Sequence, residues 1–505
     1  MPPSILLLLA SLSAAAQGTP AAALPDTSKM NILLIDIEDC YAGVWGCYGN
    51  PICKTPNVDK FARTAVRFDS AYCQAICCNP SRTSFLTGLR PPSTHVFSNG
   101  DVMDEHLPPG VITLPEMIKA RGFATADIGK LFHRIDYAEK AMSAFDRIEF
   151  YDKPPGWSGP KPILDFPPAP RRASQGPATK EKDLTAKEKR QRQRQNSDRY
   201  GDSGLAPEQE RDYQMAATAA ALLEEYSRTK SQFFLAVSQS RPHTPLVAPK
   251  RYIDMYDPAR IPTPPAPPES FADLPAHYAK RAQGGNPDIF IEKQPTAEQA
   301  RAAIAAYYAC VSFVDDNVGM ILDALDRTGL AKNTIVVFLG DHGFHLGDHH
   351  FWSKYSMLEA TRRVALIVRV PGAPANGKVC REFVEFVDLV PTFGELARLD
   401  LPANLEGTSF APLLADPERP WKKAVFMVGG SGDPGQVVRT RKYSYLEYRD
   451  ADIPAAMFDL EHDPWETINV VNDPAHAGAR RELADLLHDG WRAALPPGVK
   501  ATPGP

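Results

Sequence analysis

Asn31-Ile32-Leu33-Leu34-Ile35-Asp36-Ile37 is a run of mostly branched apolar residues, and Glu38-Asp39 follows it directly. Such a run is too short for a typical buried helix and predicts a strand with both faces covered, as in a parallel sheet. Ligands of open α/β sheets bind at the carboxyl ends of the strands. The two acids that follow the run therefore mark a position where a functional site is expected.

Runs of the same kind recur along the chain and alternate with segments of helical periodicity. We expect further strands at 123–128, 232–237, 334–339 and 365–370, and helices at 55–64, 113–122, 207–228 and 296–327. Thr113 with Glu116, and Thr296 with Gln299, have the spacing of a capping box, which marks a helix start. The alternation predicts an α/β fold, with a mostly parallel sheet sandwiched by helices.

The pattern changes near residue 421, where short strands replace the alternation. Strands are expected at 424–428, 436–439, 442–448 and 455–459, followed by a helix at 477–493. This order is typical of a small antiparallel sheet with one covered face. We therefore expect a main α/β domain over 28–420 and a smaller C-terminal subdomain of antiparallel sheet plus helix over 421–495.

The first residues of the chain predict export. An apolar run at 5–10 precedes small residues at 13–16, so residues 1–17 are expected to form a signal peptide. The segment before the run has no Lys or Arg, and an apolar disordered start is the alternative. The run is too short to span a bilayer. We expect a periplasmic or secreted protein with no stable membrane insertion.

The composition excludes few functions. The chain has 505 residues, 43% hydrophobic and 23% charged, and its net charge of -5 argues against a polyanion-binding surface over the whole molecule. Residues 152–205 are Pro-rich and then strongly charged, which predicts a solvated, loop-rich insertion. The basic run inside it could bind nucleic acid, but we expect no nucleic-acid partner. The eight cysteines lack the spacing of a zinc site, so mostly free, buried thiols are expected, with a single disulfide as the alternative.

A second pair of potential metal ligands follows another expected strand. Asp341 and His342 would lie at the same edge of the parallel sheet as Glu38 and Asp39, so four side chains could converge there. Carboxylate oxygens suit a hard cation such as Ca²⁺ or Mg²⁺. Taken alone, the first two acids would more simply be a cap of the next segment.

Cationic side chains are expected at this edge as well. Four of them follow expected strands or lie just beyond them: Lys130, His133, His243 and Lys354. Each alone would more often be a surface lysine or a hydrogen-bonded histidine. Their shared placement favours a local cationic cradle for an anionic substrate.

The segment Cys78-Asn79-Pro80-Ser81-Arg82, followed by Thr87-Gly88, is the most specific motif of the chain. A cysteine followed by x-Pro-Ser-Arg resembles the signature of the type I (formylglycine-dependent) sulfatases. The resemblance extends over nearly the whole chain and is strongest to the iduronate-2-sulfatase group. The other matching stretches are 46–49, 129–133, 233–237, 242–243, 341–343, 346–347, 354–356 and 387–392.

The resemblance implies a fold like that of alkaline phosphatase, with the catalytic domain over 28–420. It also implies that a formylglycine-generating enzyme oxidises Cys78 to 3-oxoalanine (formylglycine), whose hydrate is the nucleophile. One Ca²⁺ per chain would be bound, and the implied ligands are Glu38, Asp39, Cys78 in its oxidised form, Asp341 and His342. The neighbouring Cys77 is expected to be a core thiol.

The resemblance also assigns catalytic roles to the cationic side chains. Arg82 would orient the formylglycine, and His133 would contact one of its hydroxyl groups. Lys130 and Lys354 would hold sulfate oxygens. His243 would face the oxygen of the leaving group. The substrate implied by the resemblance is a sulfated saccharide, such as a sulfated uronic acid unit of a polysaccharide.

The chain departs from the family at the first acid of the metal site. The family usually has Asp where this chain has Glu38, and Asp36 is an alternative ligand if the strand stays regular. Two other functions stay open. One is a phosphonate or phosphate monoester hydrolase of the same superfamily, and the other is a sulfoglycan-binding protein whose Cys78 is never converted.

Overall fold

The computed structural model describes residues 23–134, 137–150, 164, 185, 187–188, 199–267, 274–278, 289–290, 294–430, 433–450 and 452–500. The expected signal peptide at 1–17 lies outside these residues, as does most of the expected insertion at 152–205. Within the described ranges, no helix combines the length and the hydrophobicity that a membrane-spanning helix needs.

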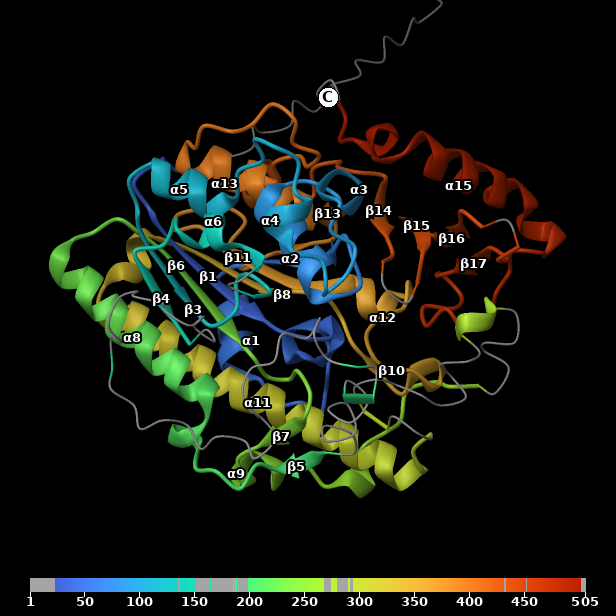
Figure 1. The fold of residues 1–505 in the computed structure, drawn as a ribbon, viewed down its shortest axis with the longest axis horizontal. Coiled ribbons are helices and arrows are strands. Elements are labelled where there is room, and N and C mark those ends of the chain that lie inside the picture. The colour runs from blue at the N-terminus through green and yellow to red at the C-terminus, as the bar shows by residue number, and fades with distance from the viewer. Residues whose placement is uncertain are drawn as a thin grey trace, which may run out of the picture.

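In the described part of the chain, nine strands form a central sheet (Figure 1). They are β1 (Asn31–Ile37), β2 (Val66–Tyr72), β3 (Ala124–Ile128), β4 (Arg147–Glu149), β6 (Phe233–Gln239), β8 (Thr334–Gly340), β11 (Arg363–Arg369), β12 (Val379–Cys380) and β13 (Val384–Glu385). Their order is β12-β2-β11-β8-β1-β6-β3-β4, with β13 also paired to β2. β11 runs antiparallel to both neighbours, and the other pairs are parallel. The expectation of a mostly parallel sheet is confirmed.

Helices cover both faces of this sheet (Figure 1). On one face lie α1 (Pro56–Ala62), α8 (Arg211–Thr229) and α11 (Ala297–Arg327), and on the other lie α2 (Cys78–Thr87), α5 (Leu114–Ala120) and α13 (Leu389–Ala397). Side chains of β1 alternate between the two cores, with Leu33 and Ile35 under α11 and Ile32 and Leu34 under α2. By the same period, the carboxylate of Asp36 faces α2.

Shorter elements connect these layers. The helices among them are α3 (Pro91–Thr94), α4 (Met103–His106), α6 (Glu139–Met142), α9 (Lys250–Ile253), α12 (Glu359–Arg362) and α14 (Ala411–Ala415). Two strand pairs lie outside the central sheet: β5 (Tyr200–Asp202) with β7 (Leu246–Ala248), and β9 (His345–Leu346) with β10 (Trp352–Ser353). The second pair is the hairpin that leads directly into Lys354.

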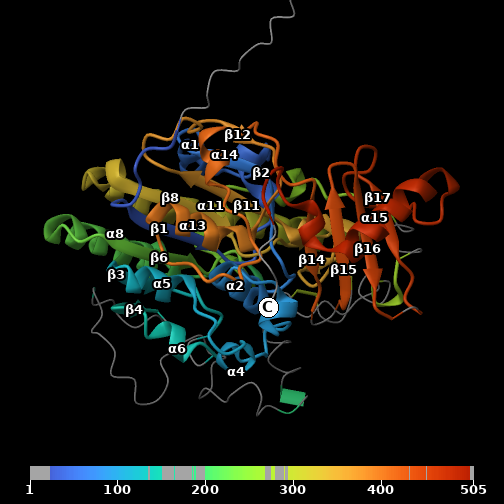
Figure 2. The same ribbon diagram turned by 90° about the horizontal axis from the view of Figure 1, so that it is seen from above.

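A separate antiparallel sheet follows near the C-terminal end (Figure 2). Its strands, in order, are β14 (Ala424–Val428), β15 (Gly435–Thr440), β16 (Tyr443–Tyr448) and β17 (Ala456–Asp459). Helix α15 (Ala477–Asp489) covers it and places Leu483 in one core with Phe426 and Val438. The expected small antiparallel sheet plus helix is confirmed. The helix ends at Asp489, earlier than expected, because Gly490 adopts a φ of 74° and terminates it.

Two elements of the structure, β2 and α2, have no clear signal in the sequence. β2 carries partly exposed polar residues such as Arg67 and Asp69 between its buried ones, which weakens the signal of a buried strand. Its pairing with β11, β12 and β13 places it in the sheet. α2 has all ten residues buried and therefore lacks the apolar and polar faces by which an amphipathic helix is recognised.

Buried charges connect the main sheet to the C-terminal sheet. Arg90 forms a two-point ion pair with Glu385, at 2.9 and 2.8 Å. The Lys422 ammonium lies 2.8 Å from Glu385 Oε2 and 2.7 Å from Asp388 Oδ1. The backbone N–H of Phe426 in β14 donates to Glu385 Oε1 at 3.0 Å. Burial alone would raise the pKa of Glu385, but the charges of Arg90 and Lys422 outweigh it and lower that pKa to about 2.

Glu385→Gln is expected to lower the free energy of unfolding at pH 7 by about 3–5 kcal/mol, because the buried Arg90 loses its two-point anionic partner and the buried Lys422 loses one of its two carboxylates. The folded-state pKa of about 2 lies below that of an unfolded glutamate. Glu385 therefore stabilises the folded protein above the unfolded pKa, and this contribution is lost as the pH falls toward the folded value. Urea unfolding measures the free energy of unfolding of both proteins. The difference between wild type and variant is expected to be smaller at pH 3 than at pH 7.

The control for this prediction is Glu382→Gln. Glu382 pairs with the exposed Arg441 at 2.7 Å, and loss of such a surface pair costs less than about 1 kcal/mol. Equal losses of stability for the two variants at pH 7 would contradict the prediction.

Candidate active site and metal centre

Cys78 is the first residue of α2 and is 1% exposed. All eight cysteines of the chain are free, in agreement with the expectation of mostly free thiols. Local structure explains why the residues that follow Cys78 stand at their positions. Pro80 lies in the first helical turn, where its missing N–H leaves no hydrogen bond unmade, and Gly88 ends the helix with a φ of 71°. The Ser81 hydroxyl donates to the Asp341 carbonyl and ties α2 to the end of β8.

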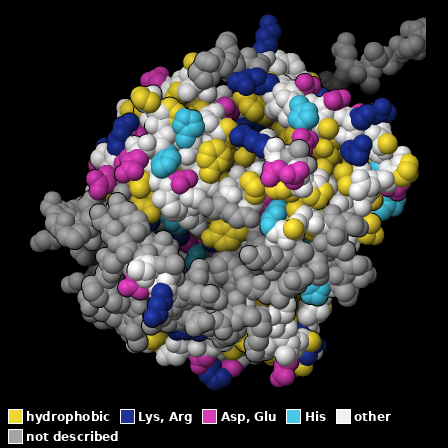
Figure 3. Space-filling view, turned by 45° about the vertical axis from the view of Figure 1, so that its right-hand side comes forward, with side chains coloured by type: hydrophobic (Ala, Val, Ile, Leu, Met, Phe, Trp, Pro, Cys, Tyr) yellow, Lys and Arg dark blue, Asp and Glu magenta, His cyan; other side chains and the backbone are white. Residues whose placement is uncertain are grey.

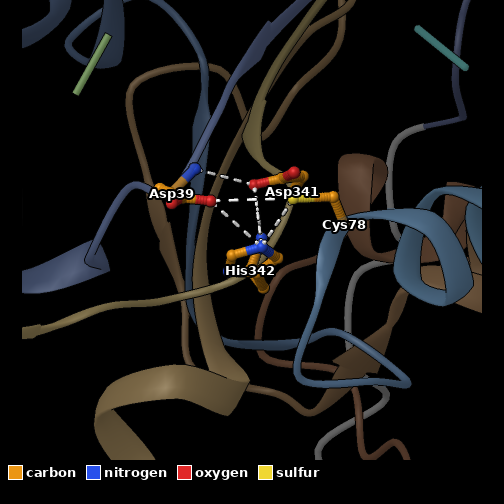
Figure 4. A group of neighbouring side chains, drawn as sticks. All are labelled: Asp39, Cys78, Asp341 and His342. Carbon is orange, nitrogen blue, oxygen red and sulfur yellow. Dashed lines mark hydrogen bonds and ion pairs between the residues drawn. The ribbon is translucent and has the colours of Figure 1, made fainter. Parts of the chain in front are cut away.

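Four side chains converge at the N-terminus of α2 (Figure 4). One potential ligand atom from each of Asp39, Cys78, Asp341 and His342 lies within 4.8 Å of the other three, and all four residues are buried. The parallel pairing of β1 with β8 explains this convergence, because Ile37 is in register with Gly340 and the next residues of both strands leave the sheet together. The structure therefore brings together three of the metal ligands expected from strand ends, and adds the signature cysteine.

The donor set fits a divalent cation. His342 Nδ1 lies 2.9 Å from the Gly343 carbonyl, which can only accept, so Nδ1 carries a proton and Nε2 is the ring atom that faces the group of four. That Nε2 faces Cys78 Sγ at 3.3 Å and Asp39 Oδ1 at 3.2 Å. Burial alone would raise the pKa of Asp39, but His243, Lys354 and His342 outweigh it and hold that pKa below its usual range. The carboxylates of Asp39 and Asp341 and the Nε2 atom of His342 thus lie around one position next to Cys78.

Arg82 lies behind the potential metal ligands and is also buried. Its guanidinium contacts Asp341 Oδ2 at 2.9 Å and Asp36 Oδ2 at 2.5 Å. It also donates to the carbonyls of Lys130 and Leu131. Burial raises the pKa of Asp36 to about 7 against the lowering effect of Arg82. Arg82 therefore fixes the Asp341 carboxylate, and its guanidinium bonds to the two acids and the two carbonyls rather than to Cys78.

Glu38 lies outside the group of four. Its Oε2 accepts from Lys130 Nζ at 2.8 Å. The Lys130 charge, together with Arg82 and His243, outweighs burial and lowers the pKa of Glu38. The two alternatives for the remaining metal ligand are thus both engaged elsewhere in this structure, with Glu38 on Lys130 and Asp36 on Arg82.

Lys354 and His243 approach the group from two further loops. Lys354 Nζ lies 2.7 and 3.0 Å from the two Asp39 carboxylate oxygens and 3.3 Å from Cys78 Sγ. His243 Nδ1 lies 2.9 Å from the Thr244 carbonyl, which turns Nε2 toward Asp39 Oδ2 at 3.8 Å. The His243 side chain is 34% exposed, whereas that of Lys354 is 2% exposed. His243 therefore lies on the side of the site that opens to solvent.

His133 is the remaining expected residue. Its Nδ1 is buried and has no hydrogen-bond partner among the described residues. Burial lowers its pKa well below the ordinary histidine value, and the nearby charges of Lys130, Arg82 and Lys354 lower it further. The ring is therefore neutral at pH 7 and has a free nitrogen that can accept a proton.

The chain matches the protein family described as Sulfatase over residues 30–399. It belongs to the sulfatase family. A second match, described as N-sulphoglucosamine sulphohydrolase, C-terminal, covers residues 347–492 of the sulfatase. The family expectation drawn from the Cys78 motif is confirmed.

Other sulfatases are similar to this one over most of its length. Iduronate 2-sulfatase of Mus musculus is 32% identical over 443 residues, which cover 81% of this chain and 75% of the relative. A sulfatase of Formosa agariphila is 30% identical over 462 residues, which cover 89% and 84%. The solved structure of a phosphonate monoester hydrolase from Silicibacter pomeroyi shares the fold, with a TM-score of 0.73 at 22% identity over 93% of this chain and 96% of that one. The alkaline-phosphatase-like fold is thereby confirmed, and the family makes the chain a sulfuric ester hydrolase.

Sequence reasoning missed one residue that shapes the site of this sulfatase. Tyr307 of α11 donates its hydroxyl proton to the Asp39 carbonyl at 2.7 Å and accepts from the Tyr41 N–H at 2.9 Å. These bonds hold Asp39 in a left-handed conformation with a φ of 53°, which is unusual outside glycine and aims its side chain at the group of four. In the sequence Tyr307 resembles any aromatic core residue of a helix, and no local signal distinguishes it.

Proposed function

We propose that this sulfatase removes sulfate from a sulfated saccharide, in the manner of an iduronate 2-sulfatase. The observation that supports this most is the contact of the Lys354 ammonium with both Cys78 and Asp39 at a buried strand edge. A desolvated, fixed cation beside the nucleophile position is what the charged ester of sulfate requires. The catalytic domain would extend over 28–420 and the C-terminal α+β subdomain over 421–495.

Residue 78 is the nucleophile in this proposal, after a formylglycine-generating enzyme has oxidised the cysteine to 3-oxoalanine. The Sγ atom of the unmodified side chain then stands in for an oxygen of the aldehyde hydrate. A simple serine or thiol would form a sulfate ester with no neighbouring hydroxyl to expel it. The hydrate has that second hydroxyl, so the sulfated form can break down and the aldehyde is regenerated.

One Ca²⁺ per chain would be held by Asp39, Asp341, His342 and residue 78, with Glu38 or Asp36 as a further ligand. When bound, this cation supplies positive charge that lowers the pKa of a hydroxyl of residue 78 and favours its anionic form. The buried, ionised Asp39 supports the assignment, because it is ready to bind without losing a proton, and His342 Nε2 faces the same position.

The chain's own cationic groups carry the first half of the reaction. A hydroxyl oxygen of residue 78 bonds to sulfur while the bond between sulfur and the sugar oxygen breaks. Lys130 and Lys354 hold the sulfuryl oxygens and stabilise their charge. His243, in its protonated form, gives its Nε2 proton to the leaving sugar oxygen. Its exposure agrees with this role, because the saccharide has to leave toward solvent.

His133 completes the second half. The sulfated hydrate has one hydroxyl left, and the neutral His133 ring takes its proton. The carbon–oxygen double bond of the aldehyde forms again as the bond from carbon to the sulfated oxygen breaks, and sulfate leaves. Water then restores the hydrate.

We propose that the substrate is an extracytoplasmic saccharide that the site itself attracts. On the face in Figure 3, acidic and basic side chains are interspersed over the described surface, so attraction of the sulfate has to come from the site itself. We propose that residues 1–17 direct export to the periplasm or the medium, where sulfated polysaccharides are accessible. No nucleic acid and no membrane anchor enter this proposal.

The test compares classes of ester on purified, converted protein. We expect kcat/KM for iduronate 2-sulfate saccharides and nitrophenyl sulfate to exceed that for a nitrophenyl phosphonate by more than tenfold, which corresponds to about 1.4 kcal/mol at the transition state. The Cys78→Ala variant measures the background. Preference for the phosphonate would assign the chain to phosphonate ester hydrolysis. Binding of the saccharide without hydrolysis, on unconverted Cys78, would instead support a sulfoglycan-binding protein.

A further inference from the structure

The segment that carries Lys354 has an unusual backbone. Ser353 has a φ of 69° and Tyr355 a φ of 73°, so the residues on both sides of Lys354 are in the left-handed region. Non-glycine residues adopt this conformation at an energetic cost and keep it only where the surrounding structure fixes them. Some group near this segment therefore has to hold it in place.

A buried chain of three side chains lies against this segment. Asp348 Oδ2 contacts His345 Nδ1, and His345 Nε2 lies 2.6 Å from the Ser356 hydroxyl oxygen. His345 and Ser356 are 0% exposed and Asp348 is 4% exposed. Because β9 pairs with β10, His345 is also in register with Ser353. The three residues thus reach the Lys354 segment from both of its ends.

The Asp348 carboxylate is the acceptor in its hydrogen bond with His345. Burial alone would raise the pKa of Asp348, but His345 outweighs it and that pKa is lowered, so the carboxylate is ionised and accepts from His345 Nδ1–H. Nε2 of the same ring then lies at hydrogen-bond distance from the Ser356 hydroxyl. The Thr361 hydroxyl donates to the Ser356 carbonyl at 2.5 Å, and its oxygen lies 3.3 Å from the Ser356 hydroxyl oxygen, which is farther than His345 Nε2 at 2.6 Å.

The order Asp–His–Ser is that of a hydrolytic triad, but the burial of Ser356 argues against a nucleophile. Its oxygen also accepts from the Leu358 N–H at 3.3 Å, which fixes it as part of the backbone scaffold. We propose that His345, oriented by Asp348, is a positioning residue that holds Lys354 against the sulfate through Ser356. This inference rests on the proposed function, in which Lys354 binds a sulfuryl oxygen.

The expected effect follows from the position of Lys354, whose ammonium lies 3.3 Å from Cys78 Sγ. A displacement of about 1 Å in such a group costs about 10²-fold in rate. His345→Ala is therefore expected to lower kcat/KM for nitrophenyl sulfate by about 10- to 100-fold and to weaken inhibition by inorganic sulfate.

His349→Ala is the matched control. His349 is a buried histidine of the same turn, but its Nε2 donates to the Trp465 carbonyl at 2.7 Å instead of meeting the Ser356 hydroxyl. We expect it to lower the melting temperature about as much as His345→Ala while changing kcat/KM less than threefold. Because the effect of His345 is exerted through Lys354, adding His345→Ala to Lys354→Ala is expected to change the rate less than about twofold.

The outcomes separate this inference from the proposed function. A converted wild type that hydrolyses no sulfate ester would refute the proposed function before any variant is compared. With an active wild type, equal activity of the His345 and His349 variants would overturn the positioning role, as would multiplicative losses in the double variant. If His345→Ala does not fold, Ser356→Ala removes only the hydroxyl. It is expected to lower kcat/KM several-fold, and activity within twofold of wild type would overturn the inference.

Discussion

Cys78→Ala is expected to lower kcat for sulfate esters by about 10⁴-fold or more, because removal of a nucleophile leaves only the binding and charge stabilisation of the remaining site. In the active wild type, the peptide that contains residue 78 is expected to be about 18 Da lighter than its sequence mass, since CH₂SH has become CHO. Steady-state kinetics and peptide mass spectrometry of the same preparation measure both quantities.

Two further variants make this result specific. Cys78→Ser keeps a hydroxyl but has no second one to expel sulfate, so at most one turnover and a sulfated serine are expected. Cys77→Ala alters the adjacent buried thiol, which precedes the helix and is absent from the proposed machinery, and should stay within a few-fold of wild type. Near-wild-type turnover by Cys78→Ser would show that the mechanism is wrong.

Ca²⁺ is expected to stabilise the folded protein and to be required for turnover. At a concentration of 100 times its Kd, binding to the folded state alone adds about 2.7 kcal/mol to the free energy of unfolding. Chelation is expected to lower kcat by about 10³-fold, because several kcal/mol of charge stabilisation are lost and each 1.4 kcal/mol is tenfold. Asp341→Asn should abolish the calcium-dependent rise in melting temperature, since it removes one of the two carboxylates of the group.

The matched control for the metal experiment is Asp315→Asn. Asp315 is a buried carboxylate of α11 that accepts from the N–H groups of Asn57 and Val58, so its loss should lower stability but leave the calcium effect intact. Glu38→Gln and Asp36→Asn decide the remaining ligand, because only the variant that removes a ligand weakens Ca²⁺ binding. An Asp341→Asn protein with a full calcium-dependent shift would contradict the proposed site.

The sequence predicts those parts of the fold whose strands are covered on both faces. β1 begins at Asn31 and ends at Ile37, as its apolar run indicates, because both of its faces pack against helices and no solvent-facing residue interrupts it. β2 near the sheet margin has no such signal. The reversed direction of β11 cannot be read from the sequence either, since an apolar run has the same composition in both directions.

The candidate site is predictable where topology alone brings residues together. Asp39 and Asp341 follow parallel neighbours in register, so their proximity follows from the strand assignment. The pairing of Glu38 with Lys130 is different, because several acids and cations crowd the same edge and side-chain conformation decides which of them meet. Sequence spacing contains no information on that choice, and the same holds for the contact between His345 and Ser356.

The burial of Cys78 restricts when the proposed oxidation of its side chain could take place. All ten residues of its helix are buried, so the oxidising enzyme of the proposed function would have to reach this stretch before the helix packs. The Ser81 hydroxyl is bonded to a carbonyl 260 positions later in the chain, and this contact cannot form until that distant strand end has been synthesised. A nascent polypeptide would therefore have an interval during synthesis in which the proposed conversion is possible. Once folding is complete, an unconverted molecule stays a thiol.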